Sequence, residues 1–464
     1  MSEKTSKKRE AAIDAEKRWD RGCDILAFIA LCLFVLSPVI QVIREWLFPH
    51  RVSEYFGNMR TYPSTVNMIM TAVILAATLR WSGLLMKTIQ KFKEGERPKL
   101  FLPLVIFGAL ALWTYISQSI NGFTDYALMG EEYRNESLLT FITYLMGYFF
   151  LGTTLRSERF RKALSIIFLG SNLVIGVLAL IDRFGPKLRV FFDSEGMSAI
   201  FHQFNHYGYY LTMAILVAAT LFIAAGSSLW IRIFSAVVFV VDNVILILNN
   251  TFGCYLAVIL ALLFGGVVIA IFRKNRGEWV RVAIVWAAFA LITVVMHSLE
   301  LGSKTNMSRL VSDIGKITSD DEKAASAGTG RWALWKHTVD YISEKPVVGW
   351  GVDGITRRLE AEKDTINDRP HNEYLQWAAF FGIPAALLYF AGLCVIMFGM
   401  FPRLKGSDSV SLACFVGAAG YIASAFVGNT MYYTAPFFFI ILGMTCRDRF
   451  YGKQSDEASG KDAA

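Results

Sequence analysis

The chain has 464 residues, of which 54% are hydrophobic and only 18% are charged, and its mean hydropathy is +0.43. Ordinary soluble domains carry about 25% charged residues, so this composition excludes a secreted disulfide scaffold, a disordered chain and a nucleic-acid-binding domain. The formal net charge of +8 must therefore be interpreted from where the basic residues lie. Because a membrane-spanning helix uses about 20 mostly apolar residues, the sequence predicts an all-α integral membrane protein.

Twelve apolar stretches are predicted to be membrane-spanning helices. They are residues 24–43, 64–80, 100–119, 138–155, 163–181, 207–225, 229–248, 252–272, 280–297, 373–400, 410–427 and 435–446, of which the last is short. With the N-terminus placed inside, the short inner segments hold 28 Lys and Arg residues, the short outer segments hold 7, and one long loop holds 11. Basic residues resist translocation, so this distribution predicts that both termini are cytoplasmic.

This interpretation divides the chain into five parts. Residues 1–23 are a basic cytoplasmic N-terminus, 24–297 the first nine spans, 298–371 a long extracytoplasmic loop, 372–446 the last three spans, and 447–464 a cytoplasmic tail. The six cysteines lie within or at the ends of spans, which predicts neither a disulfide nor a metal cluster. The first span has no cleavage pattern after it and is expected to be an uncleaved anchor.

The long loop is expected to fold as short helices. Four of its apolar residues recur at helical spacing, namely Trp332, Trp335, Val339 and Ile342. That face is expected to lie along the membrane surface or across the mouths of the spans. Pro346 and Gly349 would end this helix, and a second short helix is expected over 353–363.

The loop closes just before the tenth predicted span. Pro370 precedes this helix, so His371 is expected at its water-facing top. Tyr374 and Leu375 follow at i+3 and i+4, which places an imidazole, a phenol and an apolar contact on one helix face. Such a group can face a substrate, although an isolated interfacial His would more simply cap a helix.

Two ordered pieces of sequence resemble the O-antigen polymerase and ligase superfamily of bacterial envelope glycosyltransferases. They are TGRWALWKHTVDYISEKPVVGWGVDG and HNEYLQWAAFFGIPAALL, within residues 326–390, with fainter similarity upstream in GEEYRNESLLTFITY, FNHYGYYL and NNTFGCYLA. The resemblance implies a multi-pass enzyme of the cytoplasmic membrane. Such enzymes move a glycan from a lipid-pyrophosphate carrier, usually undecaprenyl pyrophosphate, to an acceptor sugar at the outer face of the membrane. The implied partners are this donor, the acceptor and membrane lipid, with no nucleic acid and no cofactor.

Carried over residue by residue, the family's loop arginine falls on Arg331 and its essential histidine on His371, which are therefore the expected catalytic residues. A further family arginine follows a Ser or Thr at the top of a span, but here Thr251 is followed by Phe252. Either this branch handles its donor differently or another side chain supplies the charge. The candidates are Arg134, Arg369, Arg189 and Arg183.

The expected chemistry needs these two residue types. Arginine holds phosphate oxygens with a planar, permanently charged fork, and histidine can take a proton near neutral pH. Arg331 would hold the leaving pyrophosphate while His371 deprotonates the acceptor hydroxyl from the opposite face of the sugar, which implies inversion and requires no metal. An acidic trio at 320–322 could be a metal site, but its Ser- and Ala-rich surroundings are more typical of a solvated turn.

Six further residues are candidates for substrate binding: Arg134, Asn205, His206, Arg369, Asn372 and Tyr374. Asn205 and His206 could bind sugar hydroxyls or phosphate, or could anchor their span at the interface. Arg134 could contact phosphate or stay solvated. Asp242 lies inside the seventh predicted span, where an ionised group is costly, so it is expected to face the bundle and have a partner.

A secondary transporter or a flippase for lipid-linked glycans is the main alternative, since twelve spans with both ends inside also suit a transporter. The sequence has no convincing internal repeat, and its longest hydrophilic segment lies outside after the ninth span. With Arg331 and His371 at the outer surface, this arrangement favours surface chemistry. Polymerase and ligase differ only in the acceptor, and the sequence leaves that choice open, together with the sugar and its linkage.

Overall fold

The computed structural model describes residues 3–47, 61–96, 101–130, 134–155, 157–188, 191, 197–201, 203–301, 330–352, 354, 358 and 369–446. Within these ranges the chain is all helical and has no β-strand, which confirms the predicted fold class. The first elements are α1 (Glu3–Val35), α2 (Ser37–Leu47), α4 (Thr61–Lys93), α5 (Leu102–Asn121), α6 (Asp125–Met129), α7 (Leu138–Thr143), the π-helix η1 (Tyr144–Phe149), α8 (Phe150–Thr154) and α9 (Glu158–Phe184). They are followed by α10 (Phe204–Ile223), α11 (Leu229–Asn249), α12 (Phe252–Val268), the π-helix η2 (Ile269–Arg273) and α13 (Arg276–Ser298). The last are α16 (Arg331–Glu344), α18 (Glu373–Phe381), α19 (Ile383–Met400), η3 (Phe401–Gly406), α20 (Ser409–Ser424), η4 (Ala425–Val427) and α21 (Ala435–Thr445).

Most of these helices are long and apolar enough to cross a membrane. Nine pass that test in the described part of the chain, and α1 with α2, bent by 59° at their junction, makes a tenth if the pair is one span. The other two predicted spans are the shorter helices Leu138–Thr154 and Ala435–Thr445. Each of the twelve predicted ranges therefore falls on helix, while the number of spans, twelve, stays a prediction.

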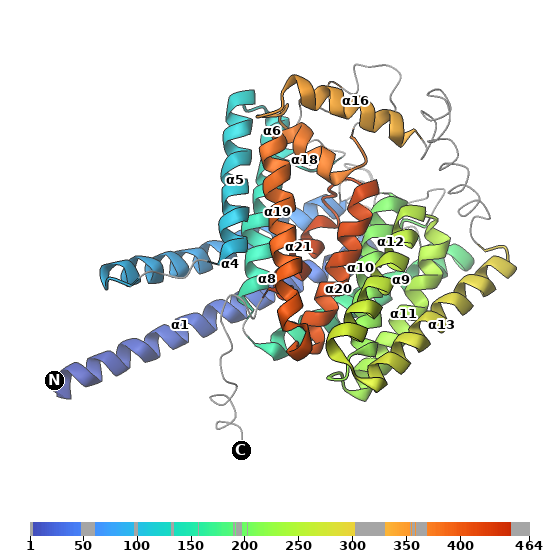
Figure 1. Cartoon of the computed structure of the whole chain (residues 1–464), viewed down its shortest axis with the longest axis horizontal. Coiled ribbons are helices and arrows are strands. Elements are labelled where there is room, and N and C mark those ends of the chain that lie inside the picture. The colour runs from blue at the N-terminus through green and yellow to red at the C-terminus, as the bar shows by residue number, and fades with distance from the viewer. Residues whose placement is uncertain are drawn as a thin grey trace.

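The tenth predicted range, 373–400, is wrong as a single helix, because the chain breaks into α18 and α19 at Gly382. Gly382 has φ of +86° and ψ of 167°, a backbone conformation that essentially only glycine adopts. A Cβ there would lie 1.8 Å from the carbonyl oxygen of Val347, and the amide of Ile383 donates to the carbonyl of Pro346 at 2.7 Å. The break turns α18 over the end of the bundle, while α19 runs down its side (Figure 1).

The predicted loop helix is confirmed as α16, which packs on α18 and lies across one end of the bundle (Figure 1). Of the predicted apolar face, Ile342 is buried while Val339 is 52% exposed, so only part of this face packs on the bundle, and its contact with the membrane surface stays a prediction. The buried face also includes Leu334, Thr338 and Tyr341. The position of α18, rather than the largest apolar residues, decides which face is covered. Of the second expected helix, 353–363, only residues 354 and 358 lie within the described part of the chain.

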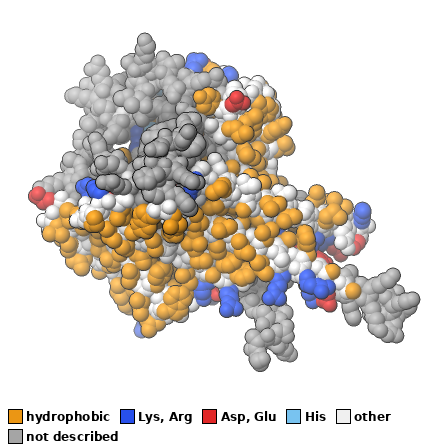
Figure 2. Space-filling view, turned by 180° about the vertical axis from the view of Figure 1, so that it is seen from behind, with side chains coloured by type: hydrophobic (Ala, Val, Ile, Leu, Met, Phe, Trp, Pro, Cys, Tyr) orange, Lys and Arg blue, Asp and Glu red, His pale blue; other side chains and the backbone are white. Residues whose placement is uncertain are grey.

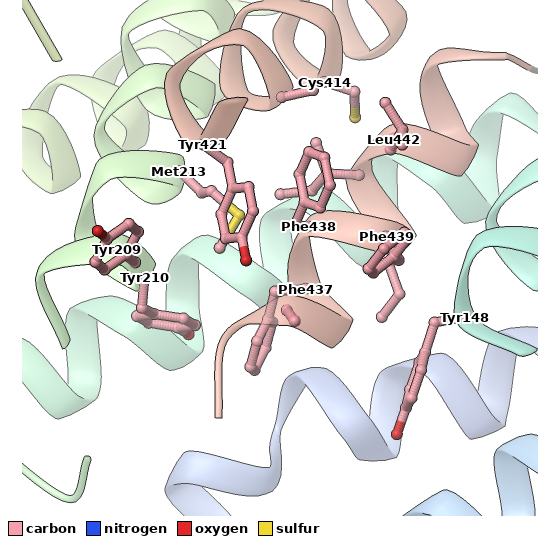
Figure 3. Close-up of a cluster of buried hydrophobic side chains, with 14 of the residues drawn as sticks. Tyr148, Tyr209, Tyr210, Met213, Cys414, Tyr421, Phe437, Phe438, Phe439 and Leu442 are labelled. Atoms are coloured by element: carbon pink, nitrogen blue, oxygen red, sulfur yellow. The ribbon is translucent and has the colours of Figure 1, made fainter. Parts of the chain in front are cut away.

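The centre of the bundle is α10, which packs against α11, α12 and α20. Figure 3 shows aromatic side chains meeting there from several helices, and the rings of Tyr421 and Phe438 stack with centroids 4.1 Å apart. Asp242 on α11 is fully buried and accepts a hydrogen bond from the Asn172 amide at 2.5 Å, so it is partnered inside the bundle as predicted. The tight core holds the outer ends of these helices in fixed relative positions.

A broad apolar band crosses the surface of the bundle, and Lys and Arg side chains gather along its lower edge, away from α16 (Figure 2). Such a band is typical of a surface that faces lipid, and such an edge is typical of the cytoplasmic side. The orientation of the chain across the membrane stays a prediction.

Candidate functional site

The segment after α16 is fixed to the end of α5 by three polar side chains. The Ser117 hydroxyl donates to the carbonyl of Val348 at 2.6 Å, and the Asn121 amide donates to the carbonyl of Gly349 at 3.2 Å. The Gln118 side-chain oxygen accepts from the amide of Val352 at 3.0 Å. A Cβ on Gly351 would lie 3.0 Å from the Gln118 side chain on α5, and one on Gly349 would lie 2.5 Å from the carbonyl oxygen of Phe380 on α18, so the two glycines of PVVGWG allow close approach to both helices.

Arg331 is the first residue of α16 and follows Gly330, whose φ is +84°. Its side chain is half-buried. α16 packs on α18, whose first residue, Glu373, follows His371 by two positions.

His371 is half-buried and has φ of +49°, a strained value for a residue with a Cβ. The segment around it is held on both sides. Asn372 caps α18, accepting from the amides of Tyr374 and Leu375, and donates to the carbonyl of Phe426 at 3.1 Å. Asn372 therefore has a structural role in fixing His371, whether or not it also touches substrate.

Arg369 lies on the other side of His371 and is buried, with 2% of its side chain exposed. It forms an ion pair with Glu136, which is equally buried and lies just before α7. Burial raises the pKa of Glu136, Arg369 and Arg134 lower it, and the net result is a pKa of about 7. Arg134 is half-buried. The predicted substrate ligand Arg369 is therefore paired with a carboxylate, and the source of the missing family arginine stays a prediction.

Glu373 is a second buried acid at this end of the bundle. Its carboxylate accepts hydrogen bonds from the hydroxyls of Tyr389 at 2.5 Å and Tyr421 at 3.0 Å. Burial raises the pKa of Glu373 to about 7, against these two bonds. Both acids lie inside sequence motifs, GEEYRNES and HNEYLQW, but neither was predicted to have a role. Their position in the sequence could have indicated one, because Glu136 follows Arg134 and Glu373 follows His371 by two residues.

A non-helical segment, residues 428–434, separates η4 from α21 beside this cluster. The side-chain oxygen of Gln376 accepts from the amide of Thr430 at 2.9 Å. Asn429 is 2% exposed, and neither of its amide atoms has a hydrogen-bond partner among the described residues. Within a membrane protein, non-helical backbone is stable only where protein buries it or water lines it. Buried polar atoms of this kind can bind sugar hydroxyls or ordered water.

The remaining predicted ligands lie around this segment. His206 is 4% exposed and stacks on Tyr433, with ring centroids 5.2 Å apart. Asn205 is half-buried at the start of α10. Tyr374 donates to the carbonyl of Ile422 at 3.0 Å, so its hydroxyl is used within the bundle. Two further predicted positions, Arg189 and the acidic trio at 320–322, lie outside the described residues. Arg183 is exposed at the end of α9.

Residues 234–390 match the family model described as O-antigen ligase. This region is similar to the O-antigen ligase family. The match confirms the resemblance predicted from the motifs, covers about a third of the chain, and contains Arg331 and His371. No curated protein matches the chain.

The O-antigen ligase region includes α11, α12, α13, α16, α18 and the start of α19. Glu136, the partner of Arg369, comes from the chain before it, just ahead of α7. The family supports a role as a membrane polysaccharide polymerase or ligase, and so a multi-pass membrane protein whose substrates are a lipid-linked glycan and an acceptor.

Proposed function

We propose that the protein transfers a glycan from a polyprenyl-pyrophosphate carrier, such as undecaprenyl pyrophosphate, to an acceptor sugar at the outer face of the cytoplasmic membrane. One observation carries this proposal. α16, which begins with Arg331, packs on α18, which begins two residues after His371. A permanent cation and an imidazole thus start two adjacent helices over one end of the bundle.

In the proposed reaction the acceptor hydroxyl attacks the anomeric carbon of the donor. A carbon–oxygen bond forms to the acceptor, the bond to the pyrophosphate oxygen breaks, and the electron pair leaves with the pyrophosphate. Arg331 binds this departing charge, while His371 accepts the hydroxyl proton. Attack from the side opposite the leaving group inverts the anomeric centre. These steps use neither a metal nor a cofactor.

Buried groups next to these residues act as positioning residues in this proposal. The pair Glu136 and Arg369 fixes the backbone on one side of His371, and the Asn372 cap fixes the other. Because 1 Å of misplacement can cost a large factor in rate, we assign Arg369 and Asn372 this role first. Arg134, Asn205, His206 and Tyr374 remain the proposed substrate contacts.

The proposed orientation places both termini in the cytoplasm and α16 outside. It is supported by the excess of basic residues in the short inner segments and by the basic lower edge of the molecule (Figure 2). A polyprenyl carrier would then reach the site sideways from the outer leaflet.

The test uses the purified chain in detergent with a lipid-pyrophosphate-linked glycan and an acceptor. His371→Ala is expected to abolish release of carrier pyrophosphate and formation of product. His337→Ala is the matched control, because His337 is an exposed histidine on α16, and it is expected to keep full activity. Detergent removes any transport compartment, so a flippase would give no product in either protein. Product formation by folded His371→Ala would remove His371 from the mechanism.

Arg331→Lys tests the phosphate role. Lysine keeps the charge but loses the planar fork, so turnover is expected to fall about 10²-fold, in the range found when one transition-state donor is removed. Lys336→Gln, on the exposed face of the same helix, is the control and is expected to be near wild type. The acceptor distinguishes the two enzyme types. Growth of chains on the carrier indicates a polymerase, and transfer of a finished chain to another molecule indicates a ligase.

A further inference from the structure

The two long N-terminal helices form an arm that leaves the bundle. α1 and α4 pack against each other, and Figure 1 shows them projecting together from its side. Arg80 on α4 pairs with Asp24 and lies 3.8 Å from Asp20. Farther out, Lys87 pairs with Glu16 at 3.0 Å and with Asp20 at 2.9 Å. Two cations of α4 thus pair with three acids of α1 along the arm.

Large apolar side chains are exposed on the outer part of this arm. On α4, Leu85, Ile89 and Phe92 follow at i, i+4 and i+7 and are 59%, 39% and 64% exposed. Met86 beside them is 66% exposed, and Trp19 on α1 is 52% exposed. A run of this size on one side of a helix is typical of contact with lipid or a partner and is unusual in water.

A groove runs between the two helices on the arm. Its apolar lining comes from Trp19, Met86 and Ile89, and its cationic lining from Lys87 and Lys93. The remaining lining residues are Glu16, Ser82, Gly83 and Gln90. A phospholipid has the complementary parts, because its acyl chain is apolar and its phosphate is anionic.

The position of the arm identifies the occupant. The arm residues lie at the outer ends of two apolar helices, the candidate span Ser64–Lys93 and Asp14–Val35, which passes the same test together with Ser37–Leu47, so the membrane surface is the nearest apolar phase. In Figure 2 the Lys and Arg side chains follow the lower edge of the apolar band toward the arm. Lys91 and Lys93 near the end of α4 are exposed. Tryptophan and lysine at such a level are typical interfacial anchors.

We propose that this arm lies in the membrane–water interface on the basic side of the molecule and that its groove binds an anionic glycerophospholipid. The acyl chain lies against Trp19, Met86 and Ile89, and the phosphate lies near Lys91 and Lys93. The site is distant from α16 and α18 and does not depend on the proposed glycosyl transfer.

The first test locates Trp19. The full chain in nanodiscs with brominated phosphatidylcholine is compared with its Trp19→Phe variant by tryptophan fluorescence. If Trp19 lies in lipid, the variant loses quenchable intensity, as does the control Trp230→Phe, which changes a 56% exposed tryptophan at the start of the candidate span α11. If Trp19→Phe loses only unquenched intensity, the arm lies in water or against a protein partner, and the proposal is overturned.

The second test measures the headgroup preference. Nanodiscs of mixed phosphatidylcholine and phosphatidylglycerol are used, and the phosphatidylglycerol retained by the purified chain is counted by mass spectrometry. Lys91→Gln with Lys93→Gln is expected to lower the relative affinity about fivefold per lysine removed. Lys274→Gln with Lys405→Gln removes two exposed lysines elsewhere and is expected to have little effect. Equal retention by the two double variants would refute the proposed anionic site.

Discussion

Gly382 separates α18 from α19, and replacing it by alanine tests whether this break places the site. An alanine there would have to keep a φ of +86° with ψ of 167°, which costs about 1–3 kcal/mol for a residue with a Cβ. The new Cβ would also lie 1.8 Å from the carbonyl oxygen of Val347, a backbone atom that cannot rotate away. Overpacking of this kind adds about 1–3 kcal/mol, so the total loss is about 2–6 kcal/mol.

The matched control is Gly330→Ala. Gly330 has nearly the same φ, +84°, but a Cβ there would have no atom within 4 Å. Only the cost of the left-handed backbone conformation remains, about 1–2 kcal/mol. Denaturation of both variants in the same detergent, followed by tryptophan fluorescence, measures the difference. The break also sets the direction of α18, which begins two residues after His371. Gly382→Ala should therefore lose glycan transfer at temperatures where the variant is still folded. Equal stability of the two alanine variants would show that the contact between Gly382 and Val347 is not tight, and the reasoning would fail.

Three further outcomes follow from the polar contacts. Burial raises the pKa of Glu373 to about 7, so its contribution to stability is complete below pH 4.5, near the ordinary pKa, and is lost as the pH rises through 7. Glu373→Gln should therefore flatten the dependence of stability on pH in this range. An unchanged slope between pH 5 and pH 8 would contradict the raised pKa of Glu373. Asp408 has its pKa held below the usual range, despite burial, by Arg161 and by bonds from Ser411, so its contribution is present above pH 3.8 and is lost as the pH falls through the lowered pKa. Asp408→Asn removes the carboxylate partner of the fully buried Arg161, which keeps the Ser411 hydroxyl, and should cost about 3–5 kcal/mol in denaturation at pH 7. A loss below 1 kcal/mol would mean that the arginine finds another anionic partner. Gln118→Ala removes the acceptor of the Val352 amide and should cost about 1–3 kcal/mol, with faster hydrogen exchange at that amide as the specific sign.

Local sequence signals predicted the elements well, because apolar runs and helical spacing are properties of neighbouring residues. The twelve ranges fall on helix, and α16 begins and ends close to its predicted limits. The break at Gly382 could not be predicted in this way, since the cause is backbone 35 residues earlier that fills the space beside it. The buried face of α16 was likewise decided by a helix whose position the sequence does not state.

In the candidate site, too, local motifs could be recognised in the sequence, whereas contacts between distant residues could not. Arg331 and His371 could be named from ordered motifs, and the structure puts them at the starts of two helices that pack together. The ion pair between Glu136 and Arg369 joins residues 233 apart, and no pattern in one sequence indicates such a pairing. The acid that occupies Arg369 is therefore visible only after folding, as are the two tyrosines that bind Glu373.

The attachment of residues 348–352 to α5 has a consequence for chimaeras. The family-matched stretch, 234–390, accepts hydrogen bonds from Ser117 and Asn121, donates one to Gln118 and takes a countercharge from Glu136, all contributed by chain that precedes it. Moved alone into another scaffold, it would leave these backbone carbonyls, an amide and a guanidinium unsatisfied. A transplant of donor or acceptor preference between relatives should therefore carry α5 and the stretch before α7 along with it, or exchange single side chains instead.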